Sequence, residues 1–419
     1  MRRTLLAIPH DIAGLSVFGV GWLLILVGLV FGIRVIWGKS RGQSVVEILR
    51  SEGFVWGVLA VAVIWLLPMV ELKNLAGEPI GMAIRGYGVM LLSGVAASVG
   101  LAHYRARRAG QDPELILAMA PWVFVGGIFG ARMFYVIQYR DKFITDNFVE
   151  TIGNIFRFTE GGLVVYGSFI GGFAAATYFL LRHRIPWLKM GDIIVPCIFI
   201  GVFFGRLGCL MNGCCYGGVC QPPQPGITFP AGSPPYMHQL ATGPLLGIEG
   251  VWSLDGLQVE KVQPASLAET RGIQPGDQLM LLLPHSIDLR AVKQEGIQMP
   301  ADLVIGGPRI GQLKLSAADL PDFSLPVHPT QVYSSINALL LCLVLWFYYP
   351  FRKHSGEVLA GLLILYPLGR FLLEAIRTDE TGQFGTALTI SQWVSIGMIF
   401  FGFRSEEHTS ELQSRQYLV

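Results

Sequence analysis

Long apolar stretches dominate this chain and constrain its fold more than any other feature. A helix needs about 20 mainly apolar residues to cross the hydrocarbon of a bilayer. Charged residues make up only 14% of the sequence, against about 25% in soluble globular proteins. We therefore predict an all-α polytopic membrane protein with about nine transmembrane helices, over residues 12–37, 53–72, 84–103, 115–138, 163–181, 190–212, 331–350, 357–376 and 387–403.

Basic residues indicate which side of the membrane the loops face. RARR at 105–108, RHR at 182–184 and FRKH at 351–354 follow alternate predicted helices. Lys and Arg concentrate in cytoplasmic loops, so we expect these three groups in the cytoplasm. The opposite helix ends then lie near the outer leaflet.

A long polar insert separates the sixth and seventh predicted helices. Its first part, 213–246, is rich in proline and is predicted to be an irregular loop. The following residues contain GLQVEKVQPASLAETRGIQPGDQLMLL. This phrase resembles a PDZ domain of bacterial envelope proteases, in which V-x-P-x-S-x-A and G-x-x-P-G-D frame a short helix. We predict a small, mainly β, PDZ-like extracytoplasmic insert over 247–320.

Ionisable and polar residues inside apolar helices are costly and mark candidate functional sites. In this chain they gather at the helix ends that are predicted to face outward. We therefore expect one polar pocket near the outer leaflet, supplied by Arg85, Tyr87, Tyr166, Arg206, His328, Arg370, Glu374 and Arg377.

Two arginines carry the chemistry expected of this pocket. Arg206 lies near the end of an apolar stretch, where it could snorkel to the interface or bind an anion; the planar guanidinium suits phosphate, and a phospholipid supplies one at that depth. Arg370, Glu374 and Arg377 share one helix face by their spacing, although Arg370 and Glu374 could equally form a structural ion pair. Arginines from two helices could stabilise a phosphate leaving group.

Four cysteines follow Arg206, in the pattern CxxxxCCxxxxC. They would supply enough thiolates for zinc, but there is no CxxC pair and no histidine within ten residues. We therefore predict no metal site and no cofactor. A local disulfide is the preferred interpretation for the cysteines beyond the helix, and we expect Cys209, Cys214, Cys215 and Cys220 to be dispensable for chemistry.

Five motifs occur in the order found in one enzyme family: IRGYGVML, GGLVVYGSFIGG, GRLGCLMNGCCYG, HPTQVY and GRFLLEAIRTDE. Over about 80–212 and 326–403 the chain resembles the prolipoprotein diacylglyceryl transferases. The resemblance implies a multi-pass protein of the bacterial cytoplasmic membrane. It implies transfer of the diacylglyceryl group of phosphatidylglycerol to the lipobox cysteine of a prolipoprotein, with formation of a thioether and release of glycerol phosphate.

The resemblance also implies roles for particular residues. It places Arg206 beside the phospholipid phosphate, Arg370 and Glu374 as the second charged pair, and Tyr87 as the tyrosine of the first shared helix. From these roles and the predicted pocket, we expect the catalytic residues to be Tyr166, Arg206, Arg370 and Glu374. We expect the substrate-binding residues to be Tyr87, Gly167, Asn212, Gly217, His328 and Arg377. Tyr166 stands where the best-known members carry histidine, which puts a simple histidine base in doubt. Either a tyrosine with a lowered pKa or the arginines alone could promote the thiolate.

The expected organisation follows from these assignments. Phosphatidylglycerol and prolipoproteins are the expected partners, with an envelope protein as a further partner of the insert and no nucleic acid. An alternative is a catalytically inactive scaffold whose PDZ-like insert binds partners by strand addition.

The end of the chain does not look native. RSEEHTSELQS at 404–414 resembles a translated sequencing adapter, so we assign no element of the fold to the tail. The expected parts are additional N-terminal helices (1–78), the two halves of the membrane core (79–212 and 321–403), the Pro-rich loop (213–246), the insert (247–320) and the tail (404–419).

Overall fold

The structure is a computed structural model whose described residues fall into two compact units, residues 1–89 and 90–419. The two units are treated separately below. The described residues are 4–73, 78–140, 143, 151, 153–155, 162, 164–220, 224–253, 256–282, 302–377, 386, 388–400 and 402.

The first unit begins with strands where the sequence predicted a helix from residue 12. β1 (Thr4–Pro9) and β4 (Leu72–Lys73) both pair antiparallel with β5 (Pro79–Arg85), and β2 (Asp11–Ile12) pairs with β3 (Leu15–Ser16). Ala13 (φ 54°) and Gly14 (φ 76°) make the turn between β2 and β3, and this left-handed backbone interrupts any helix. Arg85 accordingly ends a strand instead of opening the third helix.

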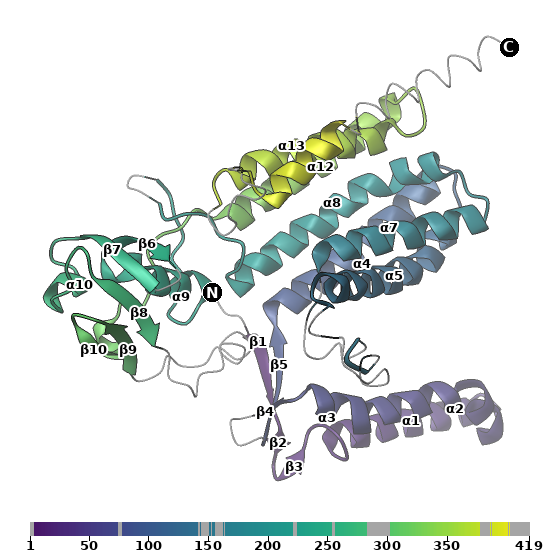
Figure 1. Ribbon diagram of the computed structural model, residues 1–419. Helices are drawn as coiled ribbons and strands as arrows, with labels where there is room; N and C mark the ends of the chain where they lie inside the picture. Colours follow the sequence, from purple (N-terminus) through teal and green to yellow (C-terminus); the bar gives the residue numbers. More distant parts are fainter. Residues whose placement is uncertain are drawn as a thin grey trace. The chain divides into compact units, whose positions relative to one another are not determined.

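A helical pair completes the first unit (Figure 1). α1 (Trp22–Ser40) is followed by α2 (Val45–Val61), a π-helical turn η1 (Ala62–Leu66) and α3 (Leu67–Val70). α2 begins at Val45 and not at residue 53, because Ser44 and Glu47 form a capping box at its start. An ion pair of 2.6 Å between Arg34 and Glu52 links α1 to α2.

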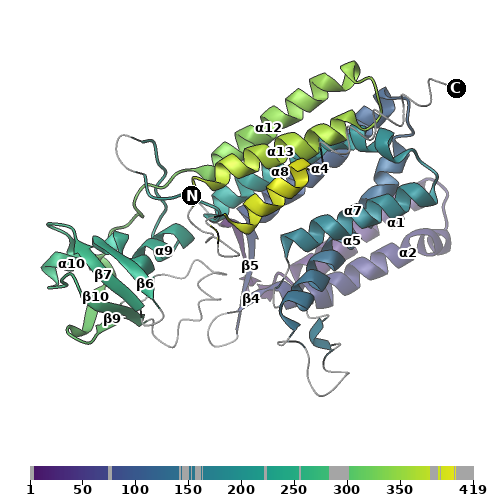
Figure 2. The same ribbon diagram turned by 45° about the horizontal axis from the view of Figure 1, so that its top comes forward.

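The second unit contains the remaining apolar helices (Figures 1 and 2). α8 packs against α12 and α13, whereas α5 packs against α7. Residues of α4 from position 90 onward belong to this unit. The helices are α4 (Gly86–Arg108), α5 (Glu114–Gln138), α7 (Val165–Arg182), α8 (Trp187–Asn212), α12 (Thr330–Tyr348), the 3₁₀ turn η6 (Tyr349–Phe351), α13 (Glu357–Glu374) and a helix at Ile390–Phe400.

Glycines spaced by four residues bring α5 and α7 into backbone contact. A Cβ added at Gly130 would lie 2.3 Å from the carbonyl oxygen of Gly167, and a Cβ at Gly171 would lie 2.2 Å from that of Gly126. Small residues at this spacing allow membrane helices to approach closely. Gly167 is therefore buried against α5.

A buried carboxylate fixes the start of α13. Asp192 on α8 is fully buried and accepts hydrogen bonds from the backbone N–H groups of Gly356 (2.7 Å) and Leu359 (3.1 Å). These N–H groups belong to the first turn, where no partner exists within the helix. Arg352 lies 3.5 Å from the same carboxylate. α8 and α13, which carry Arg206 and Arg370, are therefore joined at their far ends.

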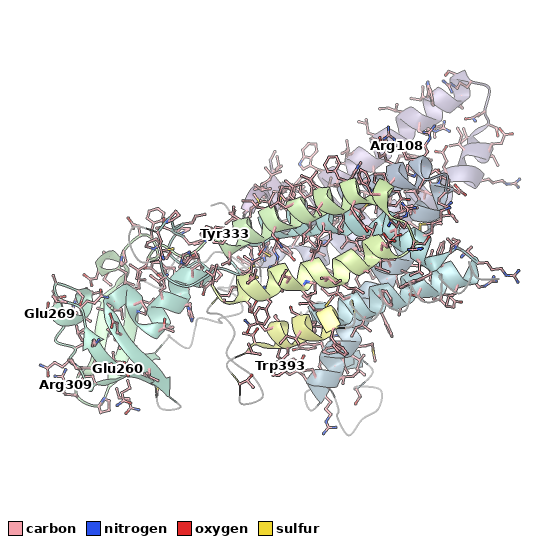
Figure 3. The ribbon with its side chains drawn as sticks, turned by 90° about the horizontal axis from the view of Figure 1, so that it is seen from above. Arg108, Glu260, Glu269, Arg309, Tyr333 and Trp393 are labelled. Atoms are coloured by element: carbon pink, nitrogen blue, oxygen red, sulfur yellow. The ribbon has the colours of Figure 1, made fainter. Side chains whose placement is uncertain are left out.

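The insert is a small sheet with its own apolar core. Its strands, all antiparallel, lie in the order β10–β9–β8–β7–β6, and charged side chains such as Glu260, Glu269 and Arg309 are exposed on it (Figure 3). The short helix expected after VQPAS is present as α10 (Leu267–Thr270), capped by Ser266. The strands are β6 (Ile248–Ser253), β7 (Gly256–Val262), β8 (Gln278–Leu282), β9 (Asp302–Gly307) and β10 (Gly311–Ser316), followed by the 3₁₀ turn η5 (Ala317–Asp319).

The sequence predicted an irregular loop for the whole Pro-rich stretch before the sheet, but part of this stretch is helical. Its last part forms α9 (Pro234–Thr242) and the 3₁₀ turn η4 (Pro244–Leu246). Proline is tolerated in the first turn of a helix, where its missing N–H would have no partner. Tyr236 and Leu240 of α9 are buried in the core of the sheet, so α9 is packed as part of the insert.

Each of the nine predicted windows contains an apolar helix in the described part of the chain. Five of these helices are long and apolar enough to cross a membrane: Trp22–Ser40, Gly86–Arg108, Glu114–Gln138, Trp187–Asn212 and Thr330–Phe351. Two shorter apolar helices lie at Val55–Val70 and Ile390–Phe400. The architecture is that of a helical membrane protein with one small β insert.

Candidate active site

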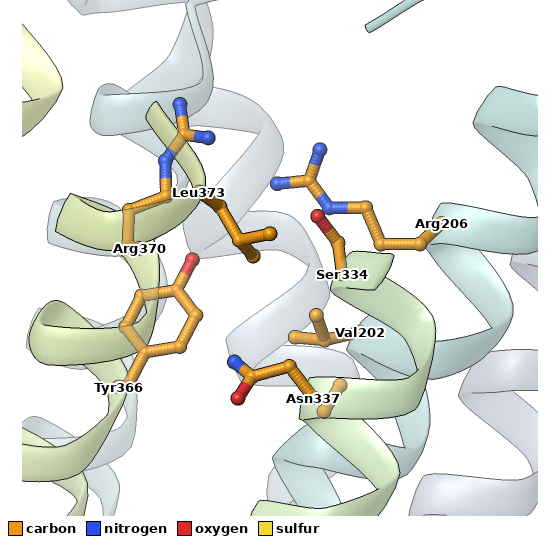
Figure 4. A pocket seen from close by; sticks show the side chains of 8 residues that line it. Val202, Arg206, Ser334, Asn337, Tyr366, Arg370 and Leu373 are labelled. Carbon is orange, nitrogen blue, oxygen red and sulfur yellow. The ribbon is translucent and has the colours of Figure 1, made fainter. Parts of the chain in front are cut away.

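Arg206 and Arg370 line one pocket in the second unit, although they come from different helices. Arg206 lies six residues before the end of α8, and Arg370 lies in the last turns of α13. Figure 4 shows their guanidinium groups on opposite walls at the same end of the pocket. The other lining residues are Val202, Ser334, Asn337, Ala338, Tyr366 and Leu373.

A buried carboxylate holds the second arginine in place. Glu374 ends α13 with its side chain fully buried. Its Oε2 lies 2.8 Å from Nη1 of Arg370 and 3.8 Å from Nη1 of Arg377. The structural ion pair considered from the sequence is therefore present. This ion pair does not prevent Arg370 from acting in the pocket, because it engages Nη1 and leaves Nη2 for another contact.

That second group binds a serine which also contacts the tyrosine of α7. Nη2 of Arg370 donates to Oγ of Ser391 at 3.0 Å, and the hydroxyl of Tyr166 lies 3.3 Å from the same oxygen. Ser391 is buried in the helix Ile390–Phe400. Tyr166, Ser391, Arg370 and Glu374 thus form one polar network from α7, the last apolar helix and α13.

Backbone pairing joins the ends of α8, α12 and α13 beside this network. Gly217 pairs with Arg377 across an isolated bridge, and its N–H donates to the carbonyl of His328 at 2.9 Å. A Cβ at Gly217 would lie 2.8 Å from Cβ of His328, so this close contact requires glycine. His328 in turn donates its N–H to Gly218 at 3.0 Å. The backbone of His328 thus makes hydrogen bonds at the entry to α12.

The cysteines near Arg206 are free thiols, so the local disulfide preferred from the sequence is not formed. The sulfurs of Cys209, Cys214 and Cys215 nevertheless lie within 4.8 Å of one another. Hydrogen bonds from the thiols of Cys209 and Cys214 lower the pKa of Cys215, and the charges of Arg206 and Arg377 act in the same direction.

Three other predicted site residues are not among those that line the pocket. Tyr87, on the first turn of α4, belongs to the first unit and is partly exposed. Gly167 is buried in the contact between α7 and α5. Asn212 is the last residue of α8, before Gly213 ends the helix in a left-handed conformation (φ 73°).

Sequence reasoning missed four polar residues of the site: Ser334, Asn337, Tyr366 and Ser391. Each lies in an apolar stretch, and polar residues there are a signal of function or packing. Hydroxyl and amide groups are less costly in a membrane than charges, so they stood out less. Figure 4 shows Tyr366 and Asn337 along the pocket wall below the guanidinium groups.

Comparison with known proteins places this geometry in a family. A model of the family described as prolipoprotein diacylglyceryl transferase matches residues 78–404. A protein of Rhodopirellula baltica named phosphatidylglycerol–prolipoprotein diacylglyceryl transferase is 40% identical, over 98% of this chain and 91% of its own length. Proteins of the same name from Clostridium tetani (26% identical, over 79% of this chain and 95% of theirs) and Synechococcus elongatus (27%, over 77% and 82%) are more distant relatives. The chain belongs to the prolipoprotein diacylglyceryl transferase family.

Proposed function

We propose that this protein transfers the diacylglyceryl group of phosphatidylglycerol to the lipobox cysteine of a prolipoprotein. One observation carries the proposal: Arg206 and Arg370, from separate apolar helices, line the same pocket in a member of this family. A pocket with two guanidinium groups among apolar helices suits a molecule that combines a phosphate with acyl chains.

The reaction is a substitution at the glyceryl carbon that carries the phosphate ester. The sulfur of the lipobox cysteine forms a bond to this carbon while the bond from carbon to the phosphate oxygen breaks. The electron pair of that bond leaves with the phosphate, and glycerol phosphate is released. Negative charge develops on the leaving oxygen, and fixed donors at that place lower the barrier. Arg206 and Arg370 are assigned to this role.

The neighbouring residues hold Arg370 and complete the site. Glu374 pairs with Arg370 on one side, and Ser391 accepts from its Nη2 on the other. Arg377, which also faces Glu374, adds positive charge beside the phosphate position. Gly217, Asn212 and His328 shape the helix ends around it.

Activation of the thiol has two candidate sources. Tyr166 could accept the proton, since its hydroxyl reaches Arg370 through Ser391. The arginines alone could also favour the thiolate by their charge. A pH–rate profile of Tyr166→Phe separates the two, because only the first source removes an ionisation from the profile.

We further propose that all nine apolar helices cross the bacterial inner membrane and that the pocket lies near the outer leaflet. Basic residues support this orientation: they close α4 (Arg105, Arg107 and Arg108) and α7 (Arg182). Arg206 lies at the opposite end of α8 from the basic residues 182–184. Labelling of introduced cysteines from outside spheroplasts tests each loop in turn.

The insert is proposed to act as a PDZ-like module that binds an envelope partner or a prolipoprotein. Its sheet ends on the edge strand β6, and edge strands accept peptides by strand addition. Replacing 234–320 by a Gly/Ser linker removes α9 together with the sheet whose core it shares. Transfer to a short peptide should then persist while transfer to full-length precursors weakens. An equal loss for both substrates would indicate that the insert only braces α8 and α12.

The test of the main proposal is direct. Purified protein in vesicles containing phosphatidylglycerol with a labelled diacylglyceryl group is incubated with a lipobox peptide. A thioether-linked product and an equal amount of released glycerol phosphate support the proposal, and vesicles of another phospholipid serve as the control. Absence of product from correctly inserted protein would favour the alternative of an inactive scaffold.

A further inference from the structure

Three cysteines, one in α8 and an adjacent pair just beyond it, converge at the end of α8. Cys209 lies in the last turn of the helix, and Cys214 and Cys215 follow Gly213, which ends it. The sulfurs of all three lie within 4.8 Å of one another, and all three residues are partly buried. Cys220 lies outside this cluster, with its thiol 3.7 Å from the carbonyl of Pro225.

The turn that brings the sulfurs together is strained and is held by α12. Cys215 adopts a left-handed backbone conformation (φ 58°), which residues other than glycine rarely adopt without compensation. Thr330 donates its hydroxyl to the carbonyl of Cys215 at 2.6 Å. Gln331, which is fully buried, donates its side-chain amide to the carbonyl of Cys214 at 2.7 Å. The backbone that carries two of the three thiols is therefore held by buried contacts.

The charge around the cluster is positive. Arg206 lies one turn before Cys209 on α8, and Arg377 pairs through its backbone with Gly217, two residues after Cys215. Three thiolates with one divalent ion carry a net charge of about −1, and burial of that charge requires a positive neighbour. The two arginines meet this requirement.

We propose that Cys209, Cys214 and Cys215 bind a thiophilic d¹⁰ metal ion, with zinc as the occupant. Zinc–sulfur bonds of about 2.3 Å place sulfurs about 3.8 Å apart in a tetrahedral site, so the thiols need to close by no more than about 1 Å. Binding displaces the three thiol protons. Three ligands leave one position for water or another small donor.

This site escaped the sequence analysis because the sulfurs do not follow a CxxC pattern. In a CxxC site a tight turn brings two sulfurs to one ion. Here the helix end at Gly213 and the left-handed Cys215 produce the same convergence from the spacing Cx₄CC. The absence of a histidine removes a fourth ligand but not the three that are present.

The site can be tested on the full-length protein in detergent. After reduction and removal of metal, the protein is titrated with Cd²⁺, which reports thiolate ligation by a charge-transfer absorption band in the ultraviolet. We expect one equivalent to bind to the wild type and to the matched controls Cys220→Ala and Cys197→Ala. Cys209→Ala and Cys214→Ala should each weaken binding at least tenfold.

A second measurement covers the case in which a cysteine variant fails to fold. Zinc added to the reduced wild type should slow alkylation of Cys214 and Cys215 at least tenfold without slowing alkylation of Cys220. The proposal is overturned if Cd²⁺ gives no such band with the wild type, if the band persists in the variants, or if zinc leaves all alkylation rates unchanged. Isolation of the wild type with two of the three cysteines joined in a disulfide under anaerobic conditions would also overturn it, in favour of a redox pair.

Discussion

Replacing Ser391 with alanine removes the one hydroxyl that joins Arg370 to Tyr166. The bond from Arg370 measures 3.0 Å and that from Tyr166 measures 3.3 Å. A hydrogen bond to a charged group contributes about 1.5–3 kcal/mol. If Ser391 orients Arg370 for the leaving phosphate, this free energy is lost from the transition state. We expect kcat/KM to fall about 10- to 150-fold.

The assay is diacylglyceryl transfer to a lipobox peptide at matched amounts of inserted protein. The fall should appear in kcat with little change in the KM for phosphatidylglycerol, because the bond orients Arg370 and does not itself bind lipid. Ser391→Thr, which keeps the hydroxyl, should restore most of the rate.

Ser395→Ala is the matched control. Ser395 is buried one turn later on the same helix, and its hydroxyl donates to the carbonyl of Ser391 at 2.8 Å. It is the same residue type and is also buried, and among the described residues its hydroxyl bonds within its own helix. Equal losses in the two alanine variants, or failure of threonine to rescue, would refute the reasoning.

Three further predictions follow from the described contacts. Gly167→Ala places a methyl group 2.3 Å from the carbonyl of Gly130 and should lower the unfolding temperature in detergent, whereas Gly100→Ala, with open space around it, should not; equal unfolding temperatures would contradict the α5–α7 contact. The hydrogen bond from Arg309 lowers the pKa of Asp277, so the stability that Asp277 gives the insert is present above about pH 4 and is lost as the pH falls through the lowered pKa. Digestion by pepsin between about pH 4 and pH 2 should therefore accelerate less steeply in Asp277→Asn, and a parallel slope would contradict the assignment. Tyr166→Phe should remove from the pH–rate profile the rise of rate with pH that reports deprotonation of the tyrosine, if the tyrosine accepts the proton, and an unchanged profile would assign thiol activation to the arginines.

Apolar periodicity and length predicted the helices well, because a bilayer imposes the same requirement on every crossing segment. The windows at 115–138 and 190–212 coincide closely with α5 (Glu114–Gln138) and α8 (Trp187–Asn212). The window from residue 12 failed at its start, because its apolar residues Ile12 and Leu15 lie in the short strands β2 and β3 and not in a helix. Hydropathy does not distinguish these two cases, whereas the turn at Ala13 and Gly14 does.

The charged part of the site was accessible from the sequence, and its connections were not. Arg206, Arg370 and Glu374 stand out because ionisable residues are rare in apolar helices. Ser391 did not stand out, because its role depends on a helix that returns to α7 and α13 from far along the chain. The cysteine cluster was not predicted, because its sulfurs converge through a left-handed turn, and motifs defined by sequence spacing do not describe such a turn.

The central claim is that Arg206 and Arg370 act together on one phosphate, and a double-mutant cycle tests it most directly. Transfer rates are measured for Arg206→Ala, Arg370→Ala and the double variant at equal levels of inserted protein. Each single variant should lose about 10²–10³-fold in kcat/KM, as for removal of one donor to a developing oxyanion. The double variant should lose far less than the product of the two, because residues that act as a unit are not additive. Near-normal rates in both single variants would contradict the account, and fully multiplicative losses would show that the two arginines do not share a phosphate.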